Sequence, residues 1–339
     1  MTKETIIKNA EKVNDYWIKE TPEPGNAEWE RACYMNGAID AYRITKRSDY
    51  LERVVNWARA NEWRFGRDPE YNTTNADDLL SGDTYLDLID EFGIDGTTEH
   101  MDKTLEWTAN DPNNDYWWWV DTFHMALNFY NRIGVRNNDE RFFDKAYNLY
   151  MDSKVTRTCF DEEEDLWFRD ERFLFDKLQN AEGKKIFWSR GNGWVFAGIA
   201  KTLRTLPKDN KYYKEYHDMF LRMAKKIKTL QLSDGFWHTD MLSPKIYDMP
   251  ETSGTVLFAL GMMIGVNEGL LGDEYAQCAI KAYEALNREA LEEDGKIGWV
   301  QVVAWDPGPV KKEATNDYAV GSYLKLSWEL LKAVENGKL

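Results

Sequence analysis

The sequence predicts an all-α protein, an (α/α)6 barrel made of six helical hairpins with small β-hairpins in its loops. Apolar residues recur at helical spacing through most of the chain, as they do at Ala38, Ala41, Tyr42 and Ile44. A loose pattern of a helix, a turn and a second amphipathic helix also returns at intervals of about 50–60 residues, the length of two helices and their connections. About six such hairpins fit a chain of 339 residues.

The character of the loops favours a closed ring over an open α-solenoid. Hairpins whose apolar faces need neighbours can stack in either arrangement, but a closed double ring leaves no exposed edge. The connecting segments are long, irregular and aromatic, as a pocket at one mouth of a barrel requires.

The elements can be followed in chain order. Residues 1–12 begin an amphipathic helix with interspersed Lys and Glu. The repeated helical units follow over residues 37–57, 82–92, 121–150, 198–223 and 254–286, with a last single helix over 321–331. Strand-like pieces, expected to form small hairpins in the loops, occupy residues 166–169, 235–240 and 298–303. No linker rich in Pro, Gly and Ser divides the chain, so residues 1–339 are expected to form one domain.

Composition excludes several classes of partner. A formal charge of −16 and a pI near 4.9 argue against binding to nucleic acid or to an anionic membrane surface, because either needs a concentrated basic face. The 15 Trp are more than a core of this size usually needs, and such an excess is typical of carbohydrate-active enzymes and of large helical cores. No apolar run is long enough to span a membrane, so we expect a cytoplasmic protein, or a periplasmic one if an export signal has been removed.

Cysteine and histidine usage does not predict a metal site. Cys33, Cys159 and Cys278 are odd in number and far apart, so neither a disulfide framework nor a zinc site is indicated. The four histidines are equally scattered. The placement of these residues therefore predicts no metal site.

The segment Phe187 to Trp194, with the sequence FWSRGNGW, reads as a sugar-binding wall. Tryptophan faces stack on pyranose rings, an arginine offers a planar fork to a carboxylate, and glycine allows a ligand to approach the backbone. The alternative is a helix N-terminus with two core tryptophans. The octapeptide alone does not decide between them.

Two further segments place carboxylates where chemistry could occur. In residues 75–86, the adjacent Asp77 and Asp78 open a helix, where capping and the helix dipole would account for at least one of them. In residues 116–125, Asp121 follows a run of aromatic side chains and precedes an apolar helix. It could be another N-cap. An aspartic acid in such apolar surroundings would have a raised pKa, which a general acid working near neutrality needs.

In these segments the sequence resembles glycoside hydrolase family 105, the unsaturated rhamnogalacturonyl and glucuronyl hydrolases, and its relative family 88. The likeness runs over nearly the whole chain. It rests on five segments in the family order, at residues 75–86, 119–125, 187–194, 250–255 and 315–318. The resemblance implies the (α/α)6 barrel as a catalytic domain, with no cofactor. It also implies removal of a 4,5-unsaturated uronic acid from the non-reducing end of oligosaccharides that lyases release from rhamnogalacturonan-like or other uronate polysaccharides.

The resemblance also implies roles for residues. Asp121 matches the aspartate that protonates C4 of the enol-ether double bond and then acts as base. A second family aspartate matches Asp77, with Asp78 as the alternative. Trp188 and Arg190 match the family's Trp-x-Arg segment and are expected to bind the uronate.

Trp194, Trp119 and His124 are expected to complete the substrate-binding wall. His124 and Asp83 depart from residues common in relatives, so substrate preference could differ. Glu251 and Ser253 are expected to cap a helix, and Thr315 and Asn316 to support a loop near the pocket.

Two other functions remain open at this point. A non-catalytic sugar-binding protein on the same barrel would have no reason to keep both Asp77 and Asp121. Another barrel enzyme, such as an ordinary glycosidase or a sugar epimerase, would need two carboxylates across the scissile bond or a pair of histidines.

Overall fold

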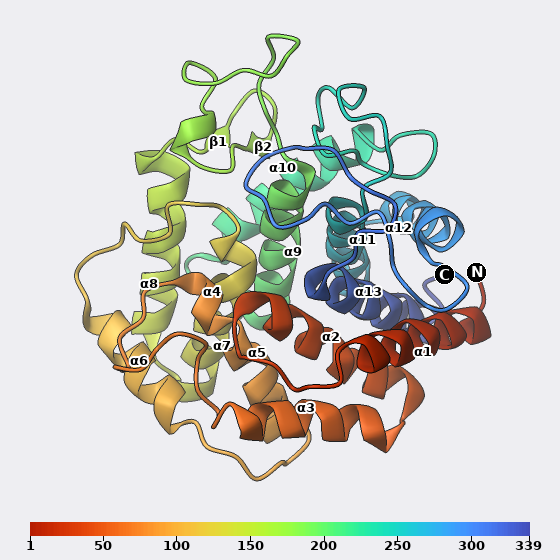
Figure 1. Ribbon diagram of the computed structural model, residues 1–339. Helices are drawn as coiled ribbons and strands as arrows, with labels where there is room; N and C mark the ends of the chain where they lie inside the picture. The colour runs from red at the N-terminus through yellow and green to blue at the C-terminus, as the bar shows by residue number, and fades with distance from the viewer.

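The computed structural model describes residues 1–339, and its helices alternate along the chain between an outer and an inner layer (Figure 1). The outer layer contains α1 (Lys3–Glu20), α3 (Ser48–Ala60), α6 (Glu99–Asn110), α8 (Glu140–Met151), α10 (Tyr213–Thr229) and α12 (Asp273–Ala285). The inner layer contains α2 (Trp29–Thr45), α4 (Ala76–Leu79) with α5 (Ser81–Leu86), the π-helical turn η2 (Phe123–Leu127) continuing into α7 (Asn128–Asn137), α9 (Ser189–Thr205), α11 (Thr252–Asn267) and α13 (Asp317–Glu335). Three more π-helical turns follow outer or inner helices, namely η1 (Asp87–Glu91), η3 (Asp152–Thr156) and η5 (Leu286–Ala290).

The inner helices form a closed ring. Going round it, α13 packs on α2, α2 on α5, α4 on η2, α7 and η2 on α9, α9 on α11, and α11 on α13 again. The outer helix α1 packs on α13, so the first and last helices of the chain make the pair that closes the barrel. The predicted (α/α)6 barrel is confirmed. The last helix, expected to be single, has α1 as its partner.

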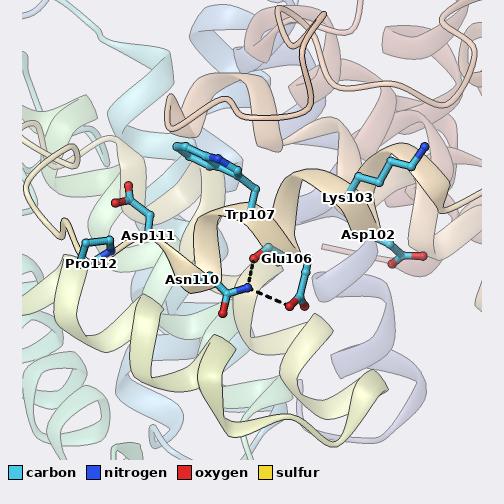
Figure 2. Close-up of a pocket in the computed structure, with 7 residues that line it drawn as sticks. All are labelled: Asp102, Lys103, Glu106, Trp107, Asn110, Asp111 and Pro112. Atoms are coloured by element: carbon cyan, nitrogen blue, oxygen red, sulfur yellow. Dashed lines mark hydrogen bonds between the residues drawn. The ribbon is translucent and has the colours of Figure 1, made fainter.

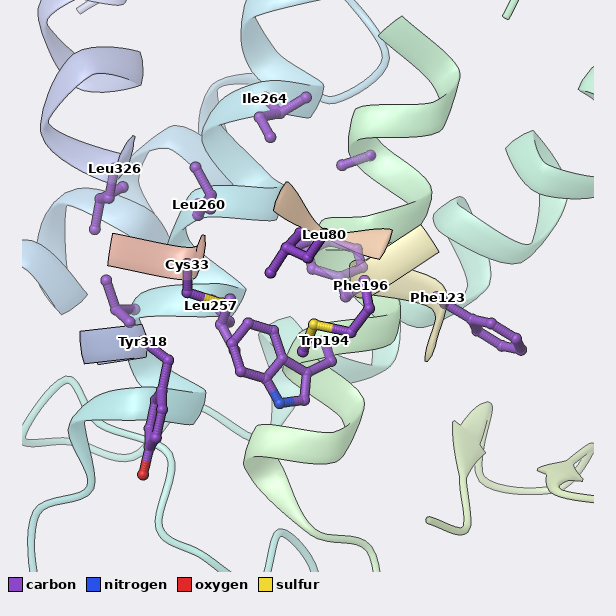
Figure 3. Close-up of a cluster of buried hydrophobic side chains, with 14 of the residues drawn as sticks. Cys33, Leu80, Phe123, Trp194, Phe196, Leu257, Leu260, Ile264, Tyr318 and Leu326 are labelled. Atoms are coloured by element: carbon purple, nitrogen blue, oxygen red, sulfur yellow. The ribbon is translucent and has the colours of Figure 1, made fainter. Parts of the chain in front are cut away.

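Burial follows the two layers. Inner helices α9 and α11 are buried on every face, whereas outer helices such as α8 and α10 bury one stripe. The buried apolar side chains of the inner helices include Trp194, Phe196 and Leu257, drawn in Figure 3. One continuous apolar cluster joins helices from both ends of the chain. The expectation of one domain over residues 1–339 stays a prediction.

Glycine allows two inner helices to approach closely. A Cβ atom at Gly37 on α2 would lie 2.2 Å from the carbonyl oxygen of Gly321 on α13. A Cβ atom at Gly321 would lie 2.1 Å from the carbonyl oxygen of Cys33. Either side chain would force α2 and α13 apart at the seam of the ring.

The loops contain less β-structure than the sequence predicts. A short antiparallel pair, β1 (Phe160–Asp161) and β2 (Leu166–Trp167), confirms strand pairing within the predicted segment 166–169. Residues 235–240 do not form a hairpin of their own, because their end pairs with residues 187–189 through one bridge between Asp240 and Trp188.

The expected hairpin at residues 298–303 is also absent. Trp299 donates to the carbonyl of Lys312 and its own carbonyl accepts from Thr252, so the backbone bonds of this segment are divided between separate partners. No continuous ladder can form.

The loops meet at one mouth of the barrel. The segments 157–188, 230–251 and 291–316 lie there, the first two at the top of Figure 1. They are tied together by hydrogen bonds, in which Asn180 donates to Asp240 at 2.9 Å and the Thr239 hydroxyl donates to the carbonyl of Gly308 at 3.1 Å. No helix in the structure is both long and apolar enough to cross a bilayer.

Candidate active site

The starts of the inner helices converge at the mouth covered by these loops. Asp77 lies in the first turn of α4, where the Asn75 side chain accepts a hydrogen bond from its backbone N–H at 3.1 Å. Asp121 lies just before η2, and Arg190 lies in the first turn of α9. Because helix N-termini carry partial positive charge, this mouth favours an anionic ligand.

Asp121 is a buried carboxyl group with a free oxygen. Its side chain makes no hydrogen bond to a backbone N–H, so it is not an N-cap, and Oδ1 has no hydrogen-bond partner. Oδ2 lies 3.5 Å from Nη2 of Arg169. Burial raises the pKa of Asp121, while the positive charges of Arg169 and Arg190 oppose that rise. An acid with a raised pKa and a free oxygen is suited to proton transfer.

Asp77 is the second acid of the site. It is partly exposed, and burial, followed by the negative charge of Asp121, raises its pKa from 3.8 to about 7. Arg67 and Arg169 oppose this rise. Because the two carboxyl groups interact, their titrations are coupled.

Asp78 has a different environment from its neighbour. It is buried, its Oδ1 accepts a hydrogen bond from Nε of Arg67 at 2.8 Å, and its Oδ2 accepts one from the Thr73 hydroxyl at 2.8 Å. Asp77, in contrast, lines a hollow of about 340 Å³. The geometry therefore favours Asp77 over Asp78 as the second acid.

That hollow is lined by aromatic and polar side chains from three segments, namely Thr74, Asn75, Asp77, Tyr116, Trp118, Trp119 and Arg169. Of the expected wall residues, only Trp119 belongs to this lining. Its backbone forms a bridge with Asp170, and its ring centroid lies 4.8 Å from that of Trp118.

Arg190 is fixed in place by the loop over residues 291–316. Its Nη1 donates to the Gln301 carbonyl at 2.6 Å and to the Tyr318 hydroxyl at 3.1 Å, and its Nη2 donates to the Val302 carbonyl at 2.9 Å. Its guanidinium lies 4.5 Å from the ring centroid of Trp188. Nε of Arg190 makes no hydrogen bond in the protein, so this N–H of the guanidinium group remains available to a ligand.

Trp188 and Gly191 shape the wall next to Asp121. The indole N–H of Trp188 donates to Oε1 of Gln301 at 2.7 Å, and its ring is 2% exposed. A Cβ atom at Gly191 would lie 3.1 Å from the Trp188 ring and 3.8 Å from Oδ1 of Asp121. Glycine at this position therefore keeps the free oxygen of the acid uncrowded.

Trp194 and His124 lie deeper in the barrel than the hollow. Their ring centroids are 4.5 Å apart, and both side chains are buried. Burial, together with the nearby charge of Lys201, lowers the pKa of His124 well below its usual value, so the imidazole is neutral. Neither ring lines the hollow that contains Asp77.

The supporting roles expected for Glu251 and Asn316 match the contacts. The Glu251 carboxylate accepts hydrogen bonds from the backbone N–H groups of Ser253 and Gly254, which caps α11. Asn316 precedes α13 and donates to Glu30 at 3.1 Å. Asp83 lies away from this hollow, in an ion pair with Arg132 at 3.1 Å.

Sequence reasoning missed the basic residue nearest to the acid. Arg169 lies between Asp121 and Asp170, and its Nη1 binds Asp170 at 2.8 Å. The pattern of residues 166–169 predicts only a strand. The signal available was an arginine directly after the apolar run that ends at Phe168.

Other hollows and clusters do not contain the acid pair. The hollow in Figure 2 runs along the outside of α6, past the exposed Trp107. No group of three or more His, Cys, Asp and Glu side chains is arranged to hold a metal ion. Cys33, Cys159 and Cys278 are buried and unpaired.

The helices form a closed ring of pairs, and one mouth of this ring contains an acid pair and fixed arginines. This arrangement is that of a helical-barrel carbohydrate enzyme. The sequence model of Glycosyl Hydrolase Family 88 matches residues 3–334. The chain belongs to that family, which confirms the resemblance seen in the sequence.

Known proteins resemble the chain over almost its whole length. An unsaturated 3S-rhamnoglycuronyl hydrolase from Formosa agariphila is 32% identical over 329 residues, which cover 91% of this chain and 85% of that protein. A solved structure of a family 88 glycosyl hydrolase from Bacteroides vulgatus superposes with a TM-score of 0.90 at 29% identity, covering 98% of this chain and 99% of the other. A solved structure described as a polysaccharide lyase superposes with a TM-score of 0.91 at 32% identity, covering 99% of each chain.

Proposed function

We propose that the protein is a glycoside hydrolase that removes a 4,5-unsaturated uronic acid from the non-reducing end of lyase-generated oligosaccharides. The observation that carries this proposal is the pair of interacting acids, Asp77 and Asp121, beside a hollow at the mouth of a family 88 barrel. Arg169 and Arg190 supply positive charge for the carboxylate of the uronic acid.

The reaction is a hydration in which Asp121 transfers the protons. The acid donates its proton to C4 of the C4=C5 double bond, which leaves a cation shared by C5 and the ring oxygen. Asp121, now ionised, takes a proton from a water molecule whose oxygen bonds to C5. The resulting hemiketal opens by breaking the bond between C5 and the ring oxygen, and the hemiacetal then formed at C1 releases the leaving sugar. One water molecule is consumed.

The similarity to a rhamnoglycuronyl hydrolase supports rhamnose as the sugar next to the unsaturated uronate. A panel of unsaturated disaccharides of ulvan, pectic and glycosaminoglycan type checks this choice. The ulvan-type and pectic substrates, in which rhamnose follows the uronate, are expected to be turned over faster than the glycosaminoglycan type. The opposite ranking would remove rhamnose from the proposal.

Ultraviolet absorbance distinguishes the proposed reaction from its main competitor. The conjugated enol acid absorbs, so a hydrolase of this class lowers the absorbance of lyase-generated oligosaccharide. The similarity to a structure described as a polysaccharide lyase makes a lyase the second candidate. A lyase would raise the absorbance of intact polysaccharide. A protein that only binds sugar would change neither.

Arg190 is expected to bind the carboxylate of the uronate. A charged, desolvated hydrogen bond contributes about 1.5–3 kcal/mol, so Arg190→Ala should raise KM for the unsaturated disaccharide by roughly one to two powers of ten. Arg190→Lys should not restore KM fully, because an ammonium group cannot reproduce the planar fork. Steady-state kinetics on the unsaturated disaccharide measure this effect.

The control for Arg190 separates charge recognition from support of the loop. Tyr318→Phe removes a hydroxyl that contacts Arg190 and keeps the positive charge. It should change KM much less than Arg190→Ala does. Equal losses for the two variants, or an equal loss by Arg190→Ala in binding a saturated, uncharged disaccharide, would make Arg190 a structural residue.

A further inference from the structure

A cluster of aromatic and basic side chains lies at the rim of the hollow that contains Asp77. Trp118, which lines that hollow, is 43% exposed, and Trp305 is 58% exposed. The guanidinium of Arg172 lies 5.7 Å from the ring centroid of Trp118 and 5.6 Å from that of Trp305. The three residues come from three separate segments of the chain, so only folding brings them together.

The arginine of the cluster is held by Asp170. Asp170 accepts hydrogen bonds from Nε of Arg172 at 2.8 Å and from Nη2 at 2.9 Å, which fixes the plane of the guanidinium. Nη1 of Arg172 makes no hydrogen bond in the protein. The guanidinium of Arg169 lies 5.4 Å from the ring centroid of Trp118 and contacts Asp121, so the cluster is joined directly to the acid.

Two exposed tryptophans arranged around a fixed cation are unusual on the surface of a globular protein. Water disfavours large apolar surface, and packing does not require it here because both rings lie outside the apolar core. Flat aromatic faces bind the C–H faces of sugar rings, and a nearby guanidinium donor can bind a hydroxyl or an acidic substituent.

We propose that Trp118, Arg172 and Trp305 form a platform that holds the saccharide on the leaving side of the scissile bond. This inference rests on the proposed function for the position of that bond. With the unsaturated ring beside Asp77 and Asp121, the next sugar leaves the hollow over Trp118 and continues towards Trp305. The platform therefore selects oligosaccharides over short glycosides.

The test compares two substrates in each variant. Trp305→Ala and Trp118→Ala are assayed on an unsaturated trisaccharide and on the methyl glycoside of the unsaturated uronate, which has no sugar for the platform. The ratio of kcat/KM for the trisaccharide to that for the methyl glycoside is expected to fall about tenfold in each variant. A ratio within twofold of wild type in both variants would overturn the proposal.

Trp107→Ala is the matched control, because Trp107 is 44% exposed on α6 and lies outside the cluster. Its ratio should equal that of the wild type. Melting temperatures of all three variants show whether the fold is retained.

A binding experiment tests the platform independently of the proposed catalytic function. Saturation-transfer NMR with a saturated rhamnosyl–uronate disaccharide should show contact with the wild type and Trp107→Ala, and a weakened signal with Trp305→Ala. If the wild type lowers the absorbance of neither substrate, the proposed hydrolase function fails. The NMR binding experiment then tests the platform without any catalytic measurement. An equal signal from the wild type and Trp305→Ala would then reject it.

Discussion

Asp121→Asn is expected to abolish turnover while leaving the fold and substrate binding nearly intact. The acid and base steps converge on this one side chain, so its loss should lower kcat by several powers of ten. Asparagine has the same shape and cannot donate a proton to C4. Single-turnover assays and calorimetric titration of the unsaturated disaccharide into the inactive variant measure the two effects separately.

The control for Asp121 is Asp115→Asn in the same loop. Asp115 is exposed and its carboxylate makes no hydrogen bond or ion pair, so this variant should keep wild-type kcat. If Asp121→Asn retained a tenth of wild-type kcat, the proton donor would have to be another residue. Asp77 would then be the first candidate because its pKa is raised to about 7.

Asp77→Asn is expected to lower the rate and to change its dependence on pH. Burial, followed by the negative charge of Asp121, raises the pKa of Asp77 to about 7, so the titrations of the two acids are coupled. With Asp77 neutralised, Asp121 is left beside Arg169 and Arg190, which favour its ionised form. The pH at which activity falls on the alkaline side should therefore move downward. A full pH profile of kcat/KM records this shift.

Asp77→Asn should also stabilise the folded protein at alkaline pH. The pKa of Asp77 is raised in the folded state, so the unfolded chain loses this proton first and stability falls as pH rises from about 4 to about 7. Asparagine removes that loss. The gain in the free energy of unfolding above pH 7 should be on the order of 2 kcal/mol, since one pKa unit corresponds to about 1.4 kcal/mol and the site is partly open to solvent.

Asp78→Asn is the matched control for both effects. It removes the charge that pairs with Arg67 and replaces one of the two acceptor oxygens, so it should lower the melting temperature at neutral pH, where Asp77→Asn raises it or leaves it unchanged. Its alkaline limb should move less than that of Asp77→Asn, because the charge of Asp78 is a smaller cause of the raised pKa of Asp77 than burial and Asp121 are. A shifted limb for Asp78→Asn with an unchanged limb for Asp77→Asn would transfer the role to Asp78.

Much of the fold could be predicted because it depends on local patterns. The helical spacing of apolar residues and the return of the hairpin unit along the chain are sufficient to predict a ring of paired helices. The small hairpins were less predictable. Residues 235–240 and 298–303 have the composition of strands, but their backbone groups bond to segments distant in the chain, so the local pattern could not reveal their partners.

The candidate site likewise contains residues that the local sequence predicts and residues that only the structure identifies. Asp121 stands out in the sequence because it ends an aromatic run and precedes an apolar helix. Asp77 and Asp78 are adjacent, however, and neighbouring side chains of a helix point about 100° apart. Only the placement of Arg67 and Thr73 shows that Asp78 is occupied in a structural contact while Asp77 faces the hollow.

The number of aromatic residues in a sequence does not show which of them are exposed for sugar binding, as the expected sugar-binding wall illustrates. Trp188, Trp194 and His124 are buried in the structure, whereas Trp118 and Trp305 are exposed at the rim. A sequence cannot separate these two groups, because a tryptophan that packs in a core and one that stacks on a sugar bury the same kind of surface.

The sequence by itself determined the layer architecture and the family, and it predicted the acid at residue 121, because each follows from short segments that can be recognised along the chain. Only the tertiary structure decided which neighbouring aspartate faces the hollow, that Arg169 lies beside Asp121, and that Trp118, Arg172 and Trp305 come together. These relations join segments that lie up to more than half the chain apart, as Trp118 and Trp305 do. Charge coupling and ring stacking act over a few ångströms of space, so they arise only once the barrel has closed.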